Sequence, residues 1–228
     1  GYESGFTIYD PEDQKAVIRR ILKNMNLNEK MWTPRTVLAA ISAAKNDLIG
    51  PDDYQRAARG DYAKEMIARL YAEYEQELLR NQAMDFDDIL RKCVHLFAVN
   101  PDILEKYQDQ FRYIMVDEYQ DTNTAQYQLI HQLSGMFGNI CVVGDDDQSI
   151  YKFRGANIRN ILDFEKDFPD AVVIRLEENY RSTKTILNAA NEVILHNLGR
   201  KRTTLWTQNE TGEKITLYQA EQEGGEAG

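Results

Sequence analysis

The stretch RYIMVDEYQDTNTAQYQLI, residues 112–130, contains three kinds of sequence in succession. It opens with the short apolar run RYIMV and continues through three carboxylates within five positions, Asp117, Glu118 and Asp121. It ends in a segment with apolar residues at helical spacing. A short, nearly unbroken apolar run of strand-forming residues is typical of a strand that is covered on both faces. The stretch therefore predicts a strand, an acidic turn and a helix.

Two further runs repeat this pattern along the chain, NICVV at 139–143 and AVVIRL at 171–176. Helical segments separate and follow the three runs, at residues 123–135, 157–168 and 182–197. Strands that alternate with helices indicate a parallel sheet of the α/β class.

Polar residues follow each of the three predicted strands. The sequence DEYQD comes after the first strand, GDDDQS after the second and EENYRS after the third. In open parallel sheets, ligands bind at the carboxyl ends of the strands. The three polar segments therefore predict one shared site at this edge of the sheet.

Residues 1 to about 81 have a different character and read as helical. Asp10 and Thr33 each precede a proline, as expected of capping residues at helix starts. From Tyr62 to Leu78, large apolar residues recur at every fourth position. Such a stripe predicts a long amphipathic helix with one face in a core.

The composition sets loose bounds on function. The chain has 228 residues, 43% of them apolar, and a formal net charge of −10. No apolar run reaches about 18 residues, the length that predicts a membrane span, and no signal peptide is visible. A negative charge argues mildly against nucleic-acid binding, but fields are screened over roughly 8 Å in the cell, so a local groove remains possible.

The cysteines and histidines carry no metal-site pattern. Cys93 and Cys141 lie far apart in apolar segments, which favours two reduced, buried thiols over a disulfide. His95, His131 and His196 lack ligand spacing, so no zinc site is predicted.

The acidic turn has a chemical interpretation. Neighbouring residues on a strand point to opposite sides, so one of Asp117 and Glu118 could hold a hydrated Mg²⁺ while the other faces an attacking water. Phosphoryl transfer needs that division between a metal ligand and a residue that orients the water. The alternative is a solvated acidic turn at the positive end of the following helix.

The second and third strand ends also carry candidates. Gln148 could sense a terminal phosphate, or be an ordinary loop glutamine. Arg181 beside Tyr180 could be an arginine finger with a ring that stacks on a base, or a surface salt bridge with a packed tyrosine.

The segment SIYKFRGA, residues 149–156, interleaves aromatic and basic side chains, including Tyr151, Phe153 and Arg154. Aromatic rings stack on bases and cations meet phosphates, which is how single strands are bound without sequence preference. The alternative is an ordinary helix edge. A phosphate-binding loop of the form GxxxxGK[ST] is absent, because none of the thirteen glycines is followed by lysine.

Taken together, five quoted segments resemble the superfamily 1 DNA helicases of the UvrD, Rep and PcrA group, and most of all the PcrA-like enzymes: PRTVLAAISAAKNDLI, MDFDDIL, VDEYQDTNTAQ, VVGDDDQSIYKFRGA and LEENYRST. The resemblance covers essentially the whole chain. It implies a helical inserted subdomain at 1–81, the second part of a RecA-like P-loop NTPase domain at 82–175, and the truncated start of a second RecA-like domain at 176–228. It also implies that the phosphate-binding loop lies upstream in a longer protein.

The resemblance assigns roles to the strand-end residues. Asp117 would bind Mg²⁺, Glu118 would activate the hydrolytic water, and Gln148 would contact the γ-phosphate of ATP. Across the cleft between domains, Arg181 would be the arginine finger and Tyr180 would stack on adenine.

The resemblance also assigns the DNA contacts. Tyr151, Phe153 and Arg154 would meet single-stranded DNA, although relatives commonly carry Trp where this chain has Phe153. Gln120 and Asp121 would be couplers within the site rather than catalysts.

The implied parent is a bacterial, cytoplasmic ATP-dependent helicase that moves 3′→5′ on single-stranded DNA. It would act at junctions of single and double strands, with repair or replication proteins as partners, and not at a membrane. The chain alone would not hydrolyse ATP. Two other hypotheses stay open: a metal-dependent nuclease built on Asp117, Glu118 and Asp145–Asp147, and a non-catalytic DNA-binding module.

Overall fold

The computed structural model describes residues 1–151, 155–196 and 204–217. Within it, the chain forms two compact units, Gly1–Ile161 and Leu162–Gly228.

The first part of the first unit is helical, as the periodicity predicts. Its helices are α1 (Pro11–Asn24), α2 (Pro34–Asn46), α3 (Pro51–Ala57) and α4 (Tyr62–Arg80). Asp10 and Thr33 cap α1 and α2, because their side chains accept backbone N–H groups of the first turn. Two short strands that the sequence did not reveal, β1 (Thr7–Ile8) and β2 (Ala83–Met84), pair in parallel and connect the start of this region to its end.

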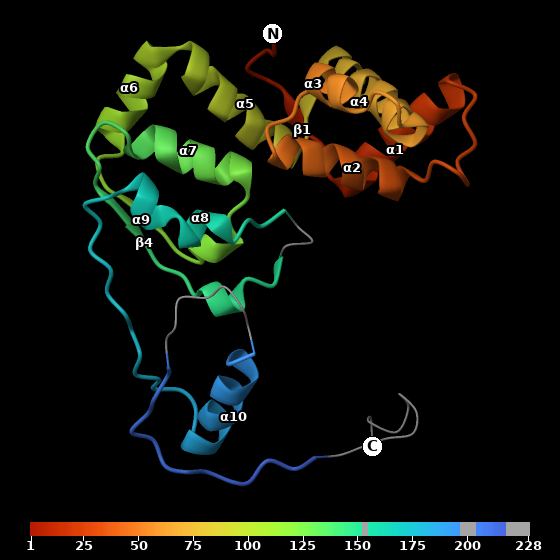
Figure 1. Cartoon of the computed structure of the whole chain (residues 1–228). Coiled ribbons are helices and arrows are strands. Elements are labelled where there is room, and N and C mark those ends of the chain that lie inside the picture. Colours follow the sequence, from red (N-terminus) through yellow and green to blue (C-terminus); the bar gives the residue numbers. More distant parts are fainter. Residues whose placement is uncertain (152–154, 197–203, 218–228) are drawn as a thin grey trace. The chain divides into compact units, whose positions relative to one another are not determined.

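Helices α1 to α4 lie together in one group (Figure 1) and share one apolar core. Its buried members come from α1, α2, α4 and β2, and include Ile18, Leu22, Val37, Ile41, Leu70, Tyr71, Tyr74 and Leu78. The predicted stripe on α4 forms one side of this core, whereas Tyr62 at its start is exposed.

The rest of the first unit is the α/β part. Its elements are α5 (Phe86–Val99), α6 (Pro101–Gln110), β3 (Ile114–Val116), the 3₁₀ turn η1 (Tyr119–Asp121), α7 (Thr124–Ser134), β4 (Ile140–Val142), the 3₁₀ turn η2 (Asp146–Gln148) and α8 (Arg159–Leu162). Strands β3 and β4 pair in parallel, with Met115 opposite Cys141. The mixture of helices with a parallel sheet confirms the predicted α/β class.

The two-stranded sheet has one partly covered face and one open face. Ile114 and Val116 are half-buried, and α7 contacts β3. Met115 and Cys141, which alternate with them, are exposed. Both cysteines are free, as predicted, but the expectation that both are buried is wrong, because Cys141 lies on the open face and Cys93 is half-buried.

The second unit contains α9 (Phe164–Asp167), α10 (Lys184–Ile194) and an isolated parallel bridge between Glu178 and Trp206. The predicted third strand at 171–176 does not form among the described residues. A strand needs neighbouring backbone to pair its N–H and C=O groups, and no described segment pairs with this one. Its apolar residues Val172, Ile174 and Leu176 are therefore left exposed.

Among the residues described, no helix is both long enough and apolar enough to cross a bilayer.

Candidate functional site

The acidic turn begins where β3 ends. Because the strand stops at Val116, both Asp117 and Glu118 lie beyond it, and the expected alternation of strand faces does not apply to them. Glu118 adopts a left-handed backbone conformation, with φ 50° and ψ 43°. Such a conformation costs a non-glycine residue about 1–2 kcal/mol. The Asp117 carboxylate accepts the Glu118 backbone N–H at 2.9 Å, which helps to hold the turn.

Gln120 links this turn to the loop after β4. Its side chain is fully buried, with 1% of its surface exposed. The amide nitrogen donates to the Glu118 carboxylate at 2.7 Å, and the amide oxygen accepts the Asp145 backbone N–H at 3.0 Å. One glutamine therefore fixes the position of Glu118 relative to the neighbouring strand end.

Gly144 leaves the space that Gln120 needs. A Cβ atom at this position would lie 2.5 Å from the Gln120 amide oxygen and 2.8 Å from the Ile161 side chain. These approaches are shorter than real contacts, so only glycine fits here while Gln120 keeps its place.

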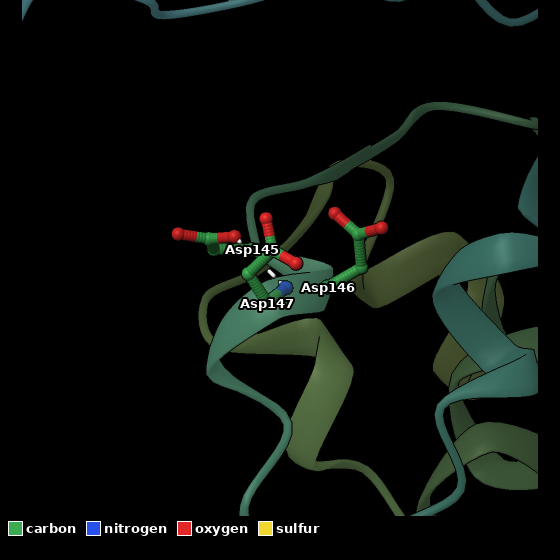
Figure 2. A group of neighbouring side chains, drawn as sticks. All are labelled: Asp145, Asp146 and Asp147. Carbon is green, nitrogen blue, oxygen red and sulfur yellow. Dashed lines mark hydrogen bonds between the residues drawn. The ribbon is translucent and has the colours of Figure 1, made fainter. Parts of the chain in front are cut away.

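The loop after β4 is a compact turn stabilised by its own first aspartate. Asp145 accepts the Asp147 backbone N–H at 3.0 Å with one oxygen and the Gln148 amide at 2.8 Å with the other. Figure 2 shows Asp145, Asp146 and Asp147 projecting from this turn. One carboxylate oxygen from each of the three lies within 4.8 Å of the others. Because both Asp145 oxygens already serve the turn, the cluster needs no metal to explain it.

A cavity of about 310 Å³ opens beside the acidic turn. Its walls come from the end of β3, the turn and one face of α7, and comprise Val116, Asp117, Glu118, Asp121, Thr122, Gln126, Leu129 and Ile130. No lysine or arginine is among these described lining residues. Asp117 and Glu118 are exposed to this space.

The donor set of the cavity fits Mg²⁺. This ion prefers carboxylate oxygens and water as ligands. One carboxylate oxygen of Asp121 is buried and has no hydrogen-bond partner in the part of the chain that the structure describes. A buried carboxylate oxygen without a partner is costly, and a bound cation beside Asp117 and Glu118 would compensate for it.

The predicted DNA-binding residues lie just beyond this loop. Tyr151 is part-exposed, whereas Phe153 and Arg154 fall outside the described residues. At Gly155 the chain turns with φ +87°, a conformation that favours glycine.

The second unit carries the other two predicted site residues. Tyr180 is 80% exposed, and its hydroxyl donates to the Glu178 carboxylate at 2.9 Å, which raises the pKa of Tyr180. Arg181 is exposed, and its guanidinium has no ion-pair partner among the described residues, so the salt bridge considered as an alternative is not formed there. The Asn179 side chain shapes this turn by accepting the Arg181 backbone N–H at 3.0 Å.

Sequence reasoning did not identify a set of buried hydrogen bonds that joins Thr122 and Asn123, which directly follow the acidic residues, to other elements. The Asn160 side-chain amide donates to both the carbonyl and the hydroxyl oxygen of Thr122, at 3.1 and 3.0 Å. Asn123 donates to Asn46 of α2 at 2.7 Å. The only available signal was the presence of asparagines inside segments otherwise read as helices.

Comparison with known proteins gives a consistent result along the whole chain. A model of the UvrD/REP helicase N-terminal domain matches residues 1–169, and a model of the UvrD-like helicase C-terminal domain matches residues 174–228. The chain is 56% identical over 227 residues to the ATP-dependent DNA helicase PcrA of Staphylococcus aureus and 53% identical over 226 residues to that of Bacillus subtilis. These alignments cover 100% and 99% of the chain but only 31% and 30% of the relatives. The chain thus spans about a third of the length of the relatives it matches.

Proposed function

Because this chain belongs to the UvrD/Rep helicase family, we propose that it is the central part of a longer ATP-dependent DNA helicase. In this proposal, the first unit supplies the carboxylates for ATP hydrolysis and the segment that contacts single-stranded DNA. Residues 1–81 form the helical inserted subdomain, 82–175 belong to the first RecA-like domain and 176–228 begin the second.

The observation that carries the proposal is the position of Glu118. Its carboxylate is fixed by the buried amide of Gln120, beside Asp117 and at the mouth of an acidic cavity. Hydrolysis of the phosphoanhydride bond of ATP needs an attacking water that is held in position, and a carboxylate in a fixed place can orient that water. A solvated acidic turn would not need a buried side chain to hold one of its carboxylates.

The remaining roles follow from the chemistry of each residue. Asp117, with the unpaired oxygen of Asp121 nearby, would hold Mg²⁺, and the bound ion would supply the positive charge that neutralises the phosphates. Gln148 would contact the γ-phosphate with its amide. From the second unit, Tyr180 would stack on the adenine ring, and Arg181 would stabilise the charge that develops on the transferred phosphoryl group.

DNA would be bound by the segment that follows Gln148. Tyr151 and Phe153 would stack on bases, while Arg154 would meet the phosphate backbone. The proposed substrate is single-stranded DNA next to a duplex, with movement in the 3′→5′ direction. The proposed cellular role is in DNA repair or replication, in the bacterial cytoplasm.

The test of this function is Glu118→Gln in the full-length protein. The amide keeps the shape of the side chain but cannot accept a proton from water, so ATP turnover should fall by about 10²–10⁴-fold while nucleotide affinity is retained. Turnover would be measured with and without single-stranded DNA, and affinity with a non-hydrolysable ATP analogue. Normal turnover in this variant would remove Glu118 from the catalytic role.

Two controls separate the alternatives. The 228-residue chain should show no ATP turnover above the level of its own Glu118→Gln variant. DNA incubated with Mg²⁺ or Mn²⁺ should remain intact. Metal-dependent cleavage that disappears in Asp117→Ala would support a nuclease instead.

A further inference from the structure

Thr122, at the end of the acidic turn, is the centre of a buried junction. Its hydroxyl donates to the Tyr119 carbonyl at 2.7 Å, which closes the turn. The Asn160 amide donates to both Thr122 oxygens at 3.1 and 3.0 Å, and the Asn157 backbone N–H donates to the Thr122 carbonyl at 3.0 Å. Thr122 and Asn160 are only 8% and 7% exposed. Residues 157–160 are therefore attached to the acidic turn by three hydrogen bonds to one residue.

Residue 149, at the start of the loop that leads to residue 157, is attached to the same acidic turn. The Ser149 hydroxyl donates to the Gln120 carbonyl at 3.4 Å. Gln120 in turn holds both the Asp145 backbone and the Glu118 carboxylate. The segment between residues 149 and 157, which includes the predicted DNA contacts, thus has both ends anchored to the acidic turn.

A third element supports this junction from the helical region. Gly155 lies against Asn46 and Asn123, because a Cβ atom placed on this glycine would be 3.7 and 3.8 Å from their Cβ atoms. Asn123 donates to Asn46 at 2.7 Å, and the pair is buried. Gly155, just before the attached residues 157–160, therefore packs against this pair from the helical region.

We infer that Thr122 and Asn160 are positioning residues through which bound DNA acts on Glu118, because they join residues 157–160, which directly follow the DNA segment, to the acidic turn. This inference rests on the proposed function of both segments. Glu118 occupies a left-handed conformation at the start of the turn that Thr122 closes. A displacement of the loop is passed to that turn, and shifts of about 1 Å in a catalytic group change rates by up to about a hundredfold.

The test compares matched substitutions in the full-length protein. Asn160→Asp removes the donor and sets a carboxylate against the Thr122 oxygens. Asn157→Asp is the control, because within the described residues the Asn157 side chain accepts the Arg159 N–H, at 3.1 Å, and an aspartate can accept it too. Thr122→Val keeps the shape of the side chain but loses the hydroxyl, whereas Thr122→Ser keeps the hydroxyl and should restore function.

The readout is the ratio of DNA-stimulated to basal ATP turnover, with thermal unfolding and single-strand affinity measured alongside. Asn160→Asp and Thr122→Val should lower this ratio by about fivefold or more, while Asn157→Asp and Thr122→Ser stay within about twofold. An unchanged ratio in both test variants would overturn the inference. So would an equal fall in basal and stimulated rates, which indicates a purely structural role.

The two proposals can fail separately. If the unmutated protein shows no DNA-stimulated turnover, the proposed function fails. If stimulation is present and survives the loss of the Thr122 junction, only the inference fails. Should Asn160→Asp unfold, Thr122→Val against Thr122→Ser decides the question, because valine replaces the Thr122 hydroxyl by a methyl group, whereas serine keeps the hydroxyl and lacks only the methyl group.

Discussion

At the scale of single residues, Gln120 gives the acidic turn a defined geometry, because its buried side chain holds the Glu118 carboxylate in place. The carboxylates could be identified in the sequence, because they follow a predicted strand and match a motif. The contact that places Gln120, and with it Glu118, relative to the next strand end could not, because it joins Gln120 to Asp145, a residue 25 positions further along the chain. Nothing in the local pattern indicates which oxygen a buried amide will meet.

Gln120→Glu tests this contact. The new carboxylate still accepts the Asp145 N–H, but it loses the donor to Glu118 and places two like charges about one hydrogen-bond length apart. We expect ATP turnover of the full-length protein to fall by about tenfold or more, because the Glu118 carboxylate would lose its hydrogen bond and be repelled by the new carboxylate, so it would no longer be held in position to orient the water.

The matched control is Gln76→Glu, which adds the same charge on the surface of α4. Its side-chain oxygen accepts from Arg80 at 3.1 Å, and a glutamate would keep this bond. Equal turnover in the two variants would show that the position of Glu118 does not depend on Gln120.

At the scale of elements, a buried group of charges joins α2 and α4 to the start of α5. Lys45 is fully buried, and its ammonium lies 2.7 Å from Glu75, 2.7 Å from Asp85 and 3.1 Å from Asp88. Burial alone would lower the pKa of Lys45, but the three carboxylates outweigh burial and raise it. The sequence predicted these helices from their apolar spacing, but that spacing does not distinguish Lys45 from a surface lysine, because its partners come from other helices.

Lys45→Met should destabilise the chain by about 3–5 kcal/mol, because removing one partner leaves buried carboxylates without compensation. The measurement is urea unfolding of the 228-residue chain. Lys30→Met, at an exposed position, should change stability by no more than about 0.5 kcal/mol. A similar loss of unfolding free energy in both variants would mean that the buried charges contribute little to stability.

Asp88 gives this cluster a pH dependence with a defined sign. Burial would raise the pKa of Asp88, but the positive charges of Lys45, Lys92 and Arg91 together hold it below its ordinary value. A depressed carboxyl pKa stabilises the fold above the unfolded value of about 3.9, and this stabilisation is lost as the pH falls through the native pKa.

Asp88→Asn should therefore be less stable than the unmutated chain at neutral pH, and the difference should shrink as the pH falls below about 4. Unfolding free energies measured by urea denaturation between neutral and acid pH would show this convergence. A difference that stays constant across the range would contradict the assigned shift.

At the scale of the whole molecule, the third predicted strand shows a limit of sequence reasoning. AVVIRL has the composition of a buried strand, and the same reasoning correctly predicted β3 and β4. A strand, however, is defined by the backbone it pairs with, and among the described residues no strand forms at 171–176. Composition reveals which segments favour an extended form, but not whether a neighbour is present.

This exposed apolar segment should make the 228-residue chain self-associate. Val172, Ile174 and Leu176 are 84%, 78% and 79% exposed, and exposed contiguous apolar surface favours association with other chains. Ile174→Asp should reduce association, measured by sedimentation at increasing concentration, without lowering the unfolding temperature.

Asn24→Asp, which adds the same charge at an exposed position at the end of α1, is the control and should leave association unchanged. If the two variants associate equally, net charge rather than the segment at 171–176 governs association. If the unmutated chain does not associate at any concentration, the prediction that exposed residues 171–176 drive self-association is wrong.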